Sequence, residues 1–385
     1  MESIPLSAPD ITEAEIAAVT AVLRTPHLSF GPELAAFESA LADYHRVPHA
    51  VAVSSGTAGL QMALLTLGIG QGDEVVIPSF TFIAVANAVV LAGATPVFAD
   101  VDPISLNLTA ATVGRVLRPR TRAILAVHTF GIPADMISLR DLATRHSLAL
   151  IEDASEAIGA EFDGRRVGSF GDLAVFGFYP NKQITTGEGG AVLAQTQAHA
   201  DRLRALRNQG RSPSATQTVS EVTHNPSSWH DWLHHPDIGF NYRLSDLACA
   251  LGRVQLSRIV EILSLRRAAA EHYHALLSGI SGLELPPLSL PRCTVSWFVF
   301  VVRLTDAAAR AGIQTSLAER GISTATYFAP IHGQPAWRNL APDPASLPVT
   351  ESVGSRTLAL PFFTRITSDQ QRQVAEALGN VLRPE

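Results

Sequence analysis

The sequence contains a single lysine, Lys182, in the segment FYPNKQITTGEGG at residues 178–190. The chain has 29 lysines and arginines together, so the other 28 are arginines, each with a guanidinium group. An amine can lose its proton and form an imine with a carbonyl group, whereas a guanidinium stays protonated. Compositional bias explains why lysines are scarce but not where the remaining one lies. We therefore expect covalent chemistry at Lys182.

Three further patterns could bind parts of a flat, charged ligand. SSGTAG at residues 54–59 joins a strand-like segment to a helical one and suits an anion, although alone it is more commonly an ordinary capped turn. Glu152 and Asp153 end an apolar strand, where side-chain alternation lets only one of them face a given side. A buried carboxylate needs a partner, which a protonated pyridine nitrogen would supply, although a helix-capping aspartate is an equally good explanation. One ring of FTF at residues 80–82 could stack on a ligand, or simply fill the core.

Together, an amine, an anion site, a strand-end carboxylate and an aromatic ring are what pyridoxal 5′-phosphate (PLP) requires. The chain lacks the P-loop, GxSxG and HExxH patterns. The histidines of HDWLHH at residues 230–235 have no supporting cysteine or carboxylate pattern, so we expect a solvated loop and no metal site. His128 and His332 each follow a strand-like segment, where a structural role is as common as a place in a site.

The elements that would position these residues alternate along the first two-thirds of the chain. Strand-like segments are followed by helical ones, which predicts a mainly parallel α/β sheet with its site at the carboxyl ends of the strands. The expected strands are 50–55, 73–78, 95–102, 122–128, 148–154 and 173–179, and the expected helices are 57–69, 82–93, 137–147 and 247–277. A polar loop at 211–236, a proline-rich boundary at 280–292 and a strand at 296–304 that opens a second α/β unit complete the prediction.

Composition restricts the class of protein. At 385 residues with 46% hydrophobic residues, the chain can form a large core, and two domains are expected. The net charge of −6 without a basic block argues against nucleic acid as a partner. Two cysteines, Cys249 and Cys293, fit a reducing cytoplasm. The start of the sequence does not resemble a signal peptide, and polar residues, glycine and proline interrupt the longest apolar stretch at 82–99, so no membrane association is expected.

The sequence resembles the DegT/StrS family of PLP-dependent sugar aminotransferases, within the fold type I (aspartate aminotransferase) superfamily. The resemblance covers nearly the whole chain. It implies a large PLP-binding domain with a mainly parallel sheet over residues 15–255, and a smaller C-terminal α/β domain over 256–385 together with 1–14. The segments that carry it are SSGTAGLQMAL, GDEVVIPSFTFIAVANAV, PVFADVD, HTFGIPADM, IEDASEAIGAEFDGRRVGSFGDLAVFGFYPNKQITTGEGG, GFNYRLSDLACALGRVQL and YFAPIH.

The resemblance implies a role for individual residues around the cofactor. Lys182 would bind PLP covalently and move protons, and Asp153 would pair with the pyridine nitrogen. Gly56 and Thr57 would bind the phosphate through the loop backbone, and Phe82 would stack on the ring.

A second group of residues would complete the site. Asn241 of the NYR motif would reach the phosphate of a neighbouring subunit, which implies a homodimer with shared active sites. Arg243 of the same motif, Tyr327 and His332 would lie near the substrate.

Two positions depart from the family pattern. Many members have a phosphate-binding serine five residues before the lysine, where this chain has Gly177, so another donor or water must substitute. The residue near the ring hydroxyl is often glutamine or histidine, and here it is Glu156.

The resemblance also implies the substrates: L-glutamate as amino donor and a keto sugar, most often linked to a nucleotide, as acceptor. The alternatives are a keto-cyclitol as acceptor, a PLP-dependent sugar dehydratase, or a non-catalytic PLP-binding regulator. Dehydrating members have histidine in place of the lysine, so Lys182 argues against the dehydratase. The regulator would need a DNA-binding element that the sequence does not display.

Overall fold

The computed structural model describes residues 3–211 and 234–382, and its largest sheet has seven strands. Its order is β1 (His49–Val53), β9 (Gly190–Ala194), β8 (Leu173–Gly177), β5 (Ala149–Asp153), β4 (Thr121–Val127), β2 (Glu74–Pro78) and β3 (Thr95–Ala99). The strand β9 is antiparallel to both of its neighbours, and the other pairs are parallel. The predicted α/β fold with a mainly parallel sheet is therefore confirmed, and β9 is a strand that the sequence analysis did not predict.

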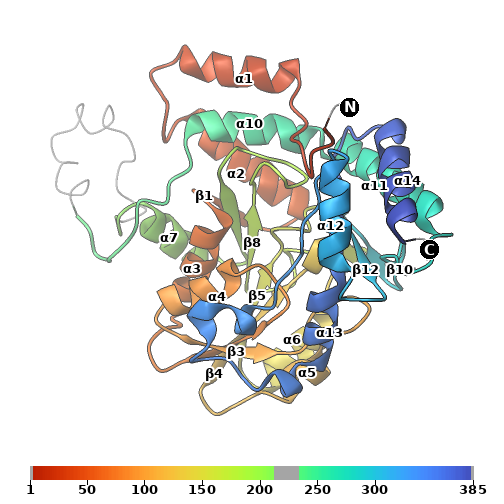
Figure 1. The fold of residues 1–385 in the computed structure, drawn as a ribbon. Helices are drawn as coiled ribbons and strands as arrows, with labels where there is room; N and C mark the ends of the chain where they lie inside the picture. The colour runs from red at the N-terminus through yellow and green to blue at the C-terminus, as the bar shows by residue number, and fades with distance from the viewer. Residues whose placement is uncertain (1–2, 212–233, 383–385) are drawn as a thin grey trace.

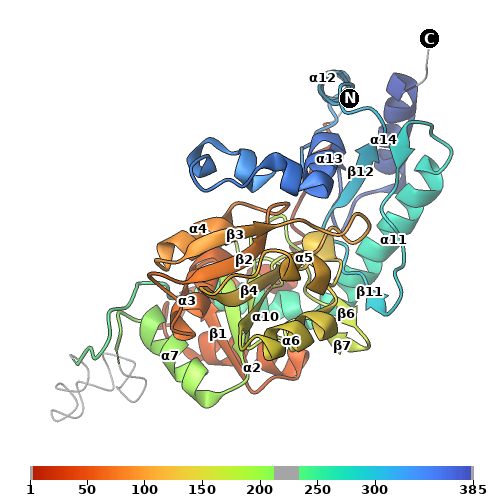
Figure 2. The same ribbon diagram turned by 90° about the horizontal axis from the view of Figure 1, so that it is seen from below.

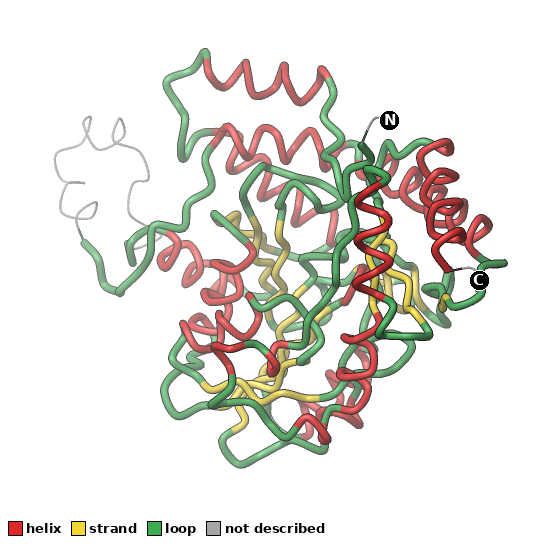
Figure 3. Tube along the Cα trace, in the orientation of Figure 1, coloured by secondary structure: helices red, strands yellow, loops and turns green. Residues whose placement is uncertain are grey.

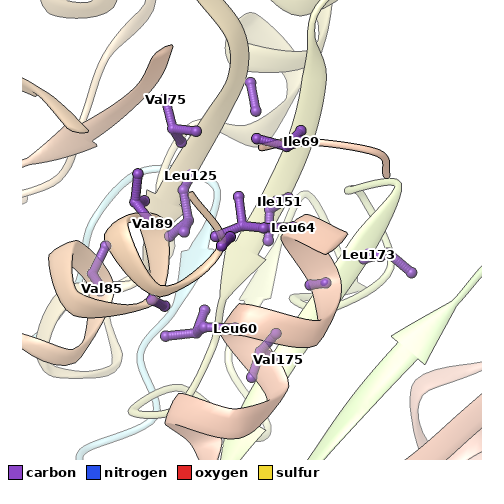
Figure 4. Packing of buried hydrophobic residues seen from close by; sticks show 14 of the residues in the cluster. Leu60, Leu64, Ile69, Val75, Val85, Val89, Leu125, Ile151, Leu173 and Val175 are labelled. Carbon is purple, nitrogen blue, oxygen red and sulfur yellow. The ribbon is translucent and has the colours of Figure 1, made fainter. Parts of the chain in front are cut away.

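Helices cover both faces of this sheet, as the tube in Figure 3 shows. Side chains alternate along each strand, so Val75 and Ile77 belong to the apolar cluster on one face and Val76 to the cluster on the other. Figure 4 shows the first cluster, where helix residues pack on strand residues. Its helices are α3 (Gly56–Thr66), α4 (Ala84–Leu91) and α7 (Gln197–Arg207), and those of the opposite face are α2 (Pro32–His45), α5 (Ala110–Gly114), α6 (Met136–Arg145) and α10 (Asp246–Ser257).

The C-terminal third forms a second layer of structure beside the large sheet (Figures 1 and 2). A three-stranded sheet of β10 (Leu283–Glu284), β12 (Phe300–Leu304) and β13 (Thr357–Leu360) packs with Tyr273 and Val374 in one apolar cluster. The surrounding helices are α11 (Ile259–Leu277), α12 (Arg310–Glu319), α13 (Pro348–Arg356) and α14 (Ser368–Leu382). A small sheet contains β6 (Glu161–Phe162), β7 (Arg165–Arg166) and β11 (Cys293–Thr294), and α1 (Glu13–Leu23) packs on α10. Short 3-10 turns occupy Thr129–Gly131, Ile331–Gly333, Pro335–Trp337 and Pro344–Ser346.

Two predicted elements differ in detail. The single helix expected over 247–277 is two helices, because Arg258 between α10 and α11 adopts φ −97° and ψ 5°. The guanidinium of Arg258 there binds the carboxylates of Asp10 and Glu15 at 2.7 Å each. The strand expected over 296–304 begins only at Phe300, because the carbonyls of Trp297 and Phe298 accept hydrogen bonds from buried Arg266 rather than from a strand.

Three other predictions concern the polar loop, membrane association and the domain boundary. Most of the loop expected at 211–236, including HDWLHH up to residue 233, lies outside the described residues. Over the described ranges, no helix combines the length and apolar character needed to cross a membrane. The domain boundary at residues 255 and 256 stays a prediction, and it falls within the last turn of α10.

Candidate active site

A cavity of about 420 Å³ opens where the parallel strands of the large sheet end. Parallel strands bring their carboxyl ends to one edge of a sheet, so segments far apart in the sequence meet there. The predicted site residues that line this cavity are Gly56, Thr57, Phe82, Asp153, Glu156, Lys182 and Tyr327.

Lys182 is held in the loop between β8 and β9. Its backbone N–H donates to the carbonyl of Tyr179 at 2.9 Å. The next residue, Gln183, is buried, and its side-chain amide donates to the carbonyl of Glu156 at 2.7 Å. The Lys182 ammonium lies 3.5 Å from Oε1 of Glu156 and 3.9 Å from the ring centroid of Phe298. The side chain is 15% exposed, so the amine faces the carboxyl group of Glu156 and an aromatic ring more than bulk water.

Glu152 and Asp153 face opposite sides of β5, and only Asp153 lines the cavity. Asp153 Oδ1 accepts a hydrogen bond from the N–H of Ser155 at 3.0 Å. Glu152 is fully buried and accepts hydrogen bonds from the N–H groups of Gly168, Phe170 and Gly171. Its role is therefore structural, and Asp153 is the carboxylate that a ligand can reach.

His128 completes the partners of Glu152. The N–H of Ala134 donates to Nδ1 of His128 at 3.0 Å, so Nε2 carries the proton and donates to Oε2 of Glu152 at 3.1 Å. Burial alone would raise the pKa of Glu152, but hydrogen bonds from His128 and the backbone lower it. The histidine is satisfied within the core and does not line the cavity.

Glu156 is the second carboxylate at the cavity, and it lies beside Lys182. Its Oε2 accepts a hydrogen bond from the N–H of Phe130 at 2.9 Å. Burial raises the pKa of Glu156, and the nearby charge of Lys182 opposes this effect without cancelling it. The site therefore holds one carboxyl group that resists ionisation close to the only amine side chain in the sequence.

The two neighbouring glutamates should give the cofactor-free protein opposite responses to pH. Because the folded pKa of Glu156 is raised, its contribution to stability is largest below pH 4.5 and is lost as pH rises through the folded pKa. Glu156→Gln should therefore gain thermal stability relative to wild type as pH rises. Because the folded pKa of Glu152 is lowered, Glu152→Gln should be less stable than wild type above pH 4.5, and this deficit should shrink in acid. Thermal midpoints measured across pH check both signs, and parallel curves for the two variants would contradict the assignment.

The N-terminus of α3 forms the polar end of the cavity. Ser55 caps the helix, because its Oγ accepts a hydrogen bond from the N–H of Ala58 at 3.1 Å. Gly56 and Thr57 follow in the first turn, where backbone N–H groups have no acceptor within the helix. These N–H groups and the helix dipole favour a bound anion.

Two aromatic groups lie at the apolar part of the cavity. Phe82 is 59% exposed at its edge, with its ring centroid 6.4 Å from that of Phe328. Tyr327 stacks between Phe328 and Phe298, at 5.1 Å and 6.4 Å between ring centroids. Burial raises the pKa of Tyr327, so its hydroxyl stays protonated near neutral pH. Phe298 is a site residue that the sequence did not reveal, since its segment resembles an ordinary strand.

Three predicted site residues lie away from the cavity lining. His332 is buried, with Nδ1 2.7 Å from Oγ of Ser79 and Nε2 2.8 Å from Oε1 of Glu351. Asn241 is exposed at a backbone bridge to Asn208. Arg243 donates a hydrogen bond to the side chain of Asn208 at 3.0 Å. Their predicted roles stay predictions.

The residues around the cavity fit PLP. Lys182 provides the amine, Asp153 a carboxylate at a strand end, and the first turn of α3 a set of anion donors that share the same cavity. Gly56 leaves room at this turn, because a Cβ there would lie 3.2 Å from Oγ of Ser155 and 3.3 Å from Cα of Gly177, both tight contacts. Across the described ranges, no group of three or more histidine, cysteine, aspartate or glutamate residues could hold a metal ion.

Comparisons with known proteins agree with this chemistry. The pattern of the DegT/DnrJ/EryC1/StrS aminotransferase family matches residues 9–379. GDP-perosamine synthase from Caulobacter vibrioides is 39% identical, over 92% of this chain and 91% of that protein. The dTDP-3-amino-3,4,6-trideoxy-alpha-D-glucose transaminase from Streptomyces venezuelae is also 39% identical, over 94% and 90%.

The fold is similar to that of solved aminotransferase structures. The crystal structure of DesV from S. venezuelae has a TM-score of 0.89 and 36% identity, and covers 100% of both chains. The Streptococcus pneumoniae protein Spr1654, described as a putative sugar aminotransferase in its PLP form, has a TM-score of 0.90 over 98% of both chains at 24% identity, which supports the fold. The chain therefore belongs to the DegT/DnrJ/EryC1/StrS aminotransferase family and is an enzyme with pyridoxal 5′-phosphate as its cofactor.

Proposed function

We propose that this enzyme transfers the amino group of L-glutamate to the carbonyl of a keto sugar linked to a nucleotide, in the biosynthesis of an amino sugar. The observation that carries the proposal is the meeting of Lys182, Asp153 and the first turn of α3 at one cavity. The sugar acceptor is supported by the two relatives, whose names contain GDP with perosamine and dTDP with an amino sugar.

In this proposal each group has a distinct task. Bound PLP supplies an aldehyde and a ring that stabilises negative charge on the substrate carbon. Lys182 would hold the cofactor covalently and, when its amine is free, would move a proton between the substrate carbon and the aldehyde carbon of the cofactor. Asp153 keeps the proton on the ring nitrogen, and Phe82 packs on the ring face. Glu156 lies next to Lys182 and would face the ring hydroxyl, as the resemblance to the family implies for this position.

We also propose a homodimer in which Asn241 of one subunit completes the phosphate site of the other. Within one chain Asn241 does not line the cavity, and it is exposed. Phe82 and Tyr179 at the cavity edge are 59% and 53% exposed, which leaves apolar surface for a partner to cover. Arg243, Tyr327 and His332 are proposed to contact the sugar nucleotide. Cys249 and Cys293 are free thiols, in keeping with a cytoplasmic enzyme.

Mixing two inactive variants should restore activity if the sites are shared. Lys182→Ala and Asn241→Ala each remove one residue, but a mixed dimer contains one site with both native residues. Random pairing should therefore yield about a quarter of the native sites. Co-expression with two different affinity tags isolates the mixed dimer. The measurement is its activity beside that of each parent, both of which must be inactive. A mixed dimer as inactive as its parents would contradict the shared site.

The acceptor is identified by following the nitrogen. The enzyme is incubated with isotopically labelled L-glutamate and a panel of GDP- and dTDP-linked keto sugars, with a keto-cyclitol as the alternative acceptor. Mass spectrometry should find the label in an amino sugar nucleotide. Label only in the cyclitol would replace the proposed acceptor, and a deoxygenated product without label would favour a dehydratase.

A further inference from the structure

Glycines form part of the cavity lining beside the α3 N-terminus. A Cβ at Gly56 would lie 3.3 Å from Cα of Gly177, and a Cβ at Gly190 would lie 2.8 Å from the backbone nitrogen of Gly56. Glycines thus let β8, β9 and the first turn of α3 approach one another closely. A ligand phosphate at this turn can accept hydrogen bonds from backbone N–H groups, but Gly177 has no side chain that could donate another.

One hydroxyl lies where such a donor is missing. A Cβ at Gly177 would meet the side chain of Ser155, at 3.3 Å from its Cβ and 3.4 Å from its Oγ. The same Oγ would be 3.2 Å from a Cβ at Gly56. Ser155 comes from the segment after β5, so its hydroxyl reaches this corner from a different element and stands between the two glycines.

The hydroxyl of Ser155 is also available. Ser55 and Ser155 both line the cavity, and Oγ of Ser55 accepts the N–H of Ala58, which holds that hydroxyl at the helix cap while leaving its proton free. The backbone N–H of Ser155 donates to Oδ1 of Asp153 at 3.0 Å, which holds the backbone of residue 155 beside the cavity. Within residues 3–211 and 234–382, the Ser155 hydroxyl has no hydrogen-bond partner, so it can donate to a ligand without losing an internal bond.

We infer that Ser155 donates a hydrogen bond to the PLP phosphate and fills the place that Gly177 leaves without a donor. The inference rests on the cofactor and the phosphate position of the proposed function, and it concerns residues of this chain alone. Two parts of the cofactor would then be bound within three residues, because Asp153 would pair with the ring nitrogen and also accepts the backbone N–H of Ser155. A serine at position 177 would crowd the side chain of Ser155, so the two serines are alternatives rather than partners.

The test compares the binding of PLP with the binding of pyridoxal, which lacks the phosphate. Both aldehydes are titrated into cofactor-free Ser155→Ala and wild-type enzyme, and binding is followed by absorbance without any amino donor or sugar. A lost hydrogen bond to a charged group should weaken PLP binding about 10- to 100-fold. Pyridoxal binding should stay unchanged, because it depends on Lys182 and the ring contacts. Equal weakening of both aldehydes, or no change in either, would overturn the inference.

A second variant separates a lost donor from a change in cavity shape. Adding Gly177→Ser to Ser155→Ala restores a hydroxyl beside the place of the lost one, with the new Cβ 3.3 Å from the retained Cβ of residue 155, so PLP affinity should return toward the wild-type value. Gly177→Ser alone should bind PLP no better than wild type, since the two side chains compete for one space. Failure of the double variant to recover any affinity, with pyridoxal binding intact, would also count against the inference. Because no substrate is present, these results are independent of the donor and acceptor proposed above.

Discussion

Lys182→Arg should abolish transamination and lower kcat by about 10⁴-fold or more. This is the upper range for removing an acid–base group, and the loss of the covalent bond to the cofactor adds to it. The substitution keeps the positive charge beside Glu156 and above the Phe298 ring, so the contacts of the loop survive. A guanidinium cannot lose its proton or bond covalently to an aldehyde. The expected result is a folded protein that no longer retains PLP covalently.

The single lysine makes this prediction unusually easy to control. Borohydride reduction of the wild-type enzyme with PLP should fix the cofactor to the peptide that contains Lys182, and mass spectrometry identifies that peptide. Adding Arg372→Lys on α14 to Lys182→Arg restores one lysine far from the cavity, and it should restore neither label nor activity. Cofactor fixed to any other peptide of the wild-type enzyme, such as the N-terminal one, would show that Lys182 is not the attachment site.

Asp153→Asn should produce the second largest loss. Asparagine can still accept the hydrogen bond from the N–H of Ser155, so the local turn is kept. It cannot provide the negative charge that holds a proton on the ring nitrogen. Removing one partner of a buried ion pair costs about 3–5 kcal/mol, which corresponds to roughly 10²- to 10⁴-fold in kcat.

Glu152→Gln is the matched control, because it changes the adjacent carboxylate on the other side of β5. That side chain does not line the cavity, so kcat per folded, PLP-loaded subunit should stay close to wild type even if stability falls. Comparable losses of kcat in both variants would mean that the strand, rather than the charge at Asp153, limits the reaction.

Much of the fold could be predicted because strands and helices alternate clearly in the sequence. The strand β9 could not be predicted, because Gly190–Ala194 is a short apolar run after two glycines, Gly187 and Gly189, and its antiparallel direction depends on pairing with β1. The end of one helix and the start of the next at Arg258 could not be predicted for a similar reason. One non-helical residue between α10 and α11 leaves the apolar pattern nearly unchanged, and its partners Asp10 and Glu15 are distant in sequence.

The same distinction holds in the site. The alternation of β5 shows that only one of Glu152 and Asp153 can face a ligand, but the choice depends on which face packs against His128 and Gly168. The contact of Phe298 with Lys182 could not be predicted from the sequence either, because residues 296–299 fit a strand pattern but lie outside β12. Residues that follow strands could be identified from the sequence, because the topology places the ends of parallel strands at one edge of the sheet.

The most direct measurement of transamination is a single half-reaction with glutamate alone. PLP-loaded enzyme is mixed with L-glutamate in the absence of sugar, absorbance is followed, and 2-oxoglutarate is assayed in parallel. The absorbance of the cofactor bound to Lys182 should disappear, with about one 2-oxoglutarate released per site, because the amino group stays on the cofactor. A keto sugar nucleotide should then restore the original spectrum. An unchanged spectrum with no oxoglutarate, for glutamate and for other amino donors, would contradict an aminotransferase built around Lys182.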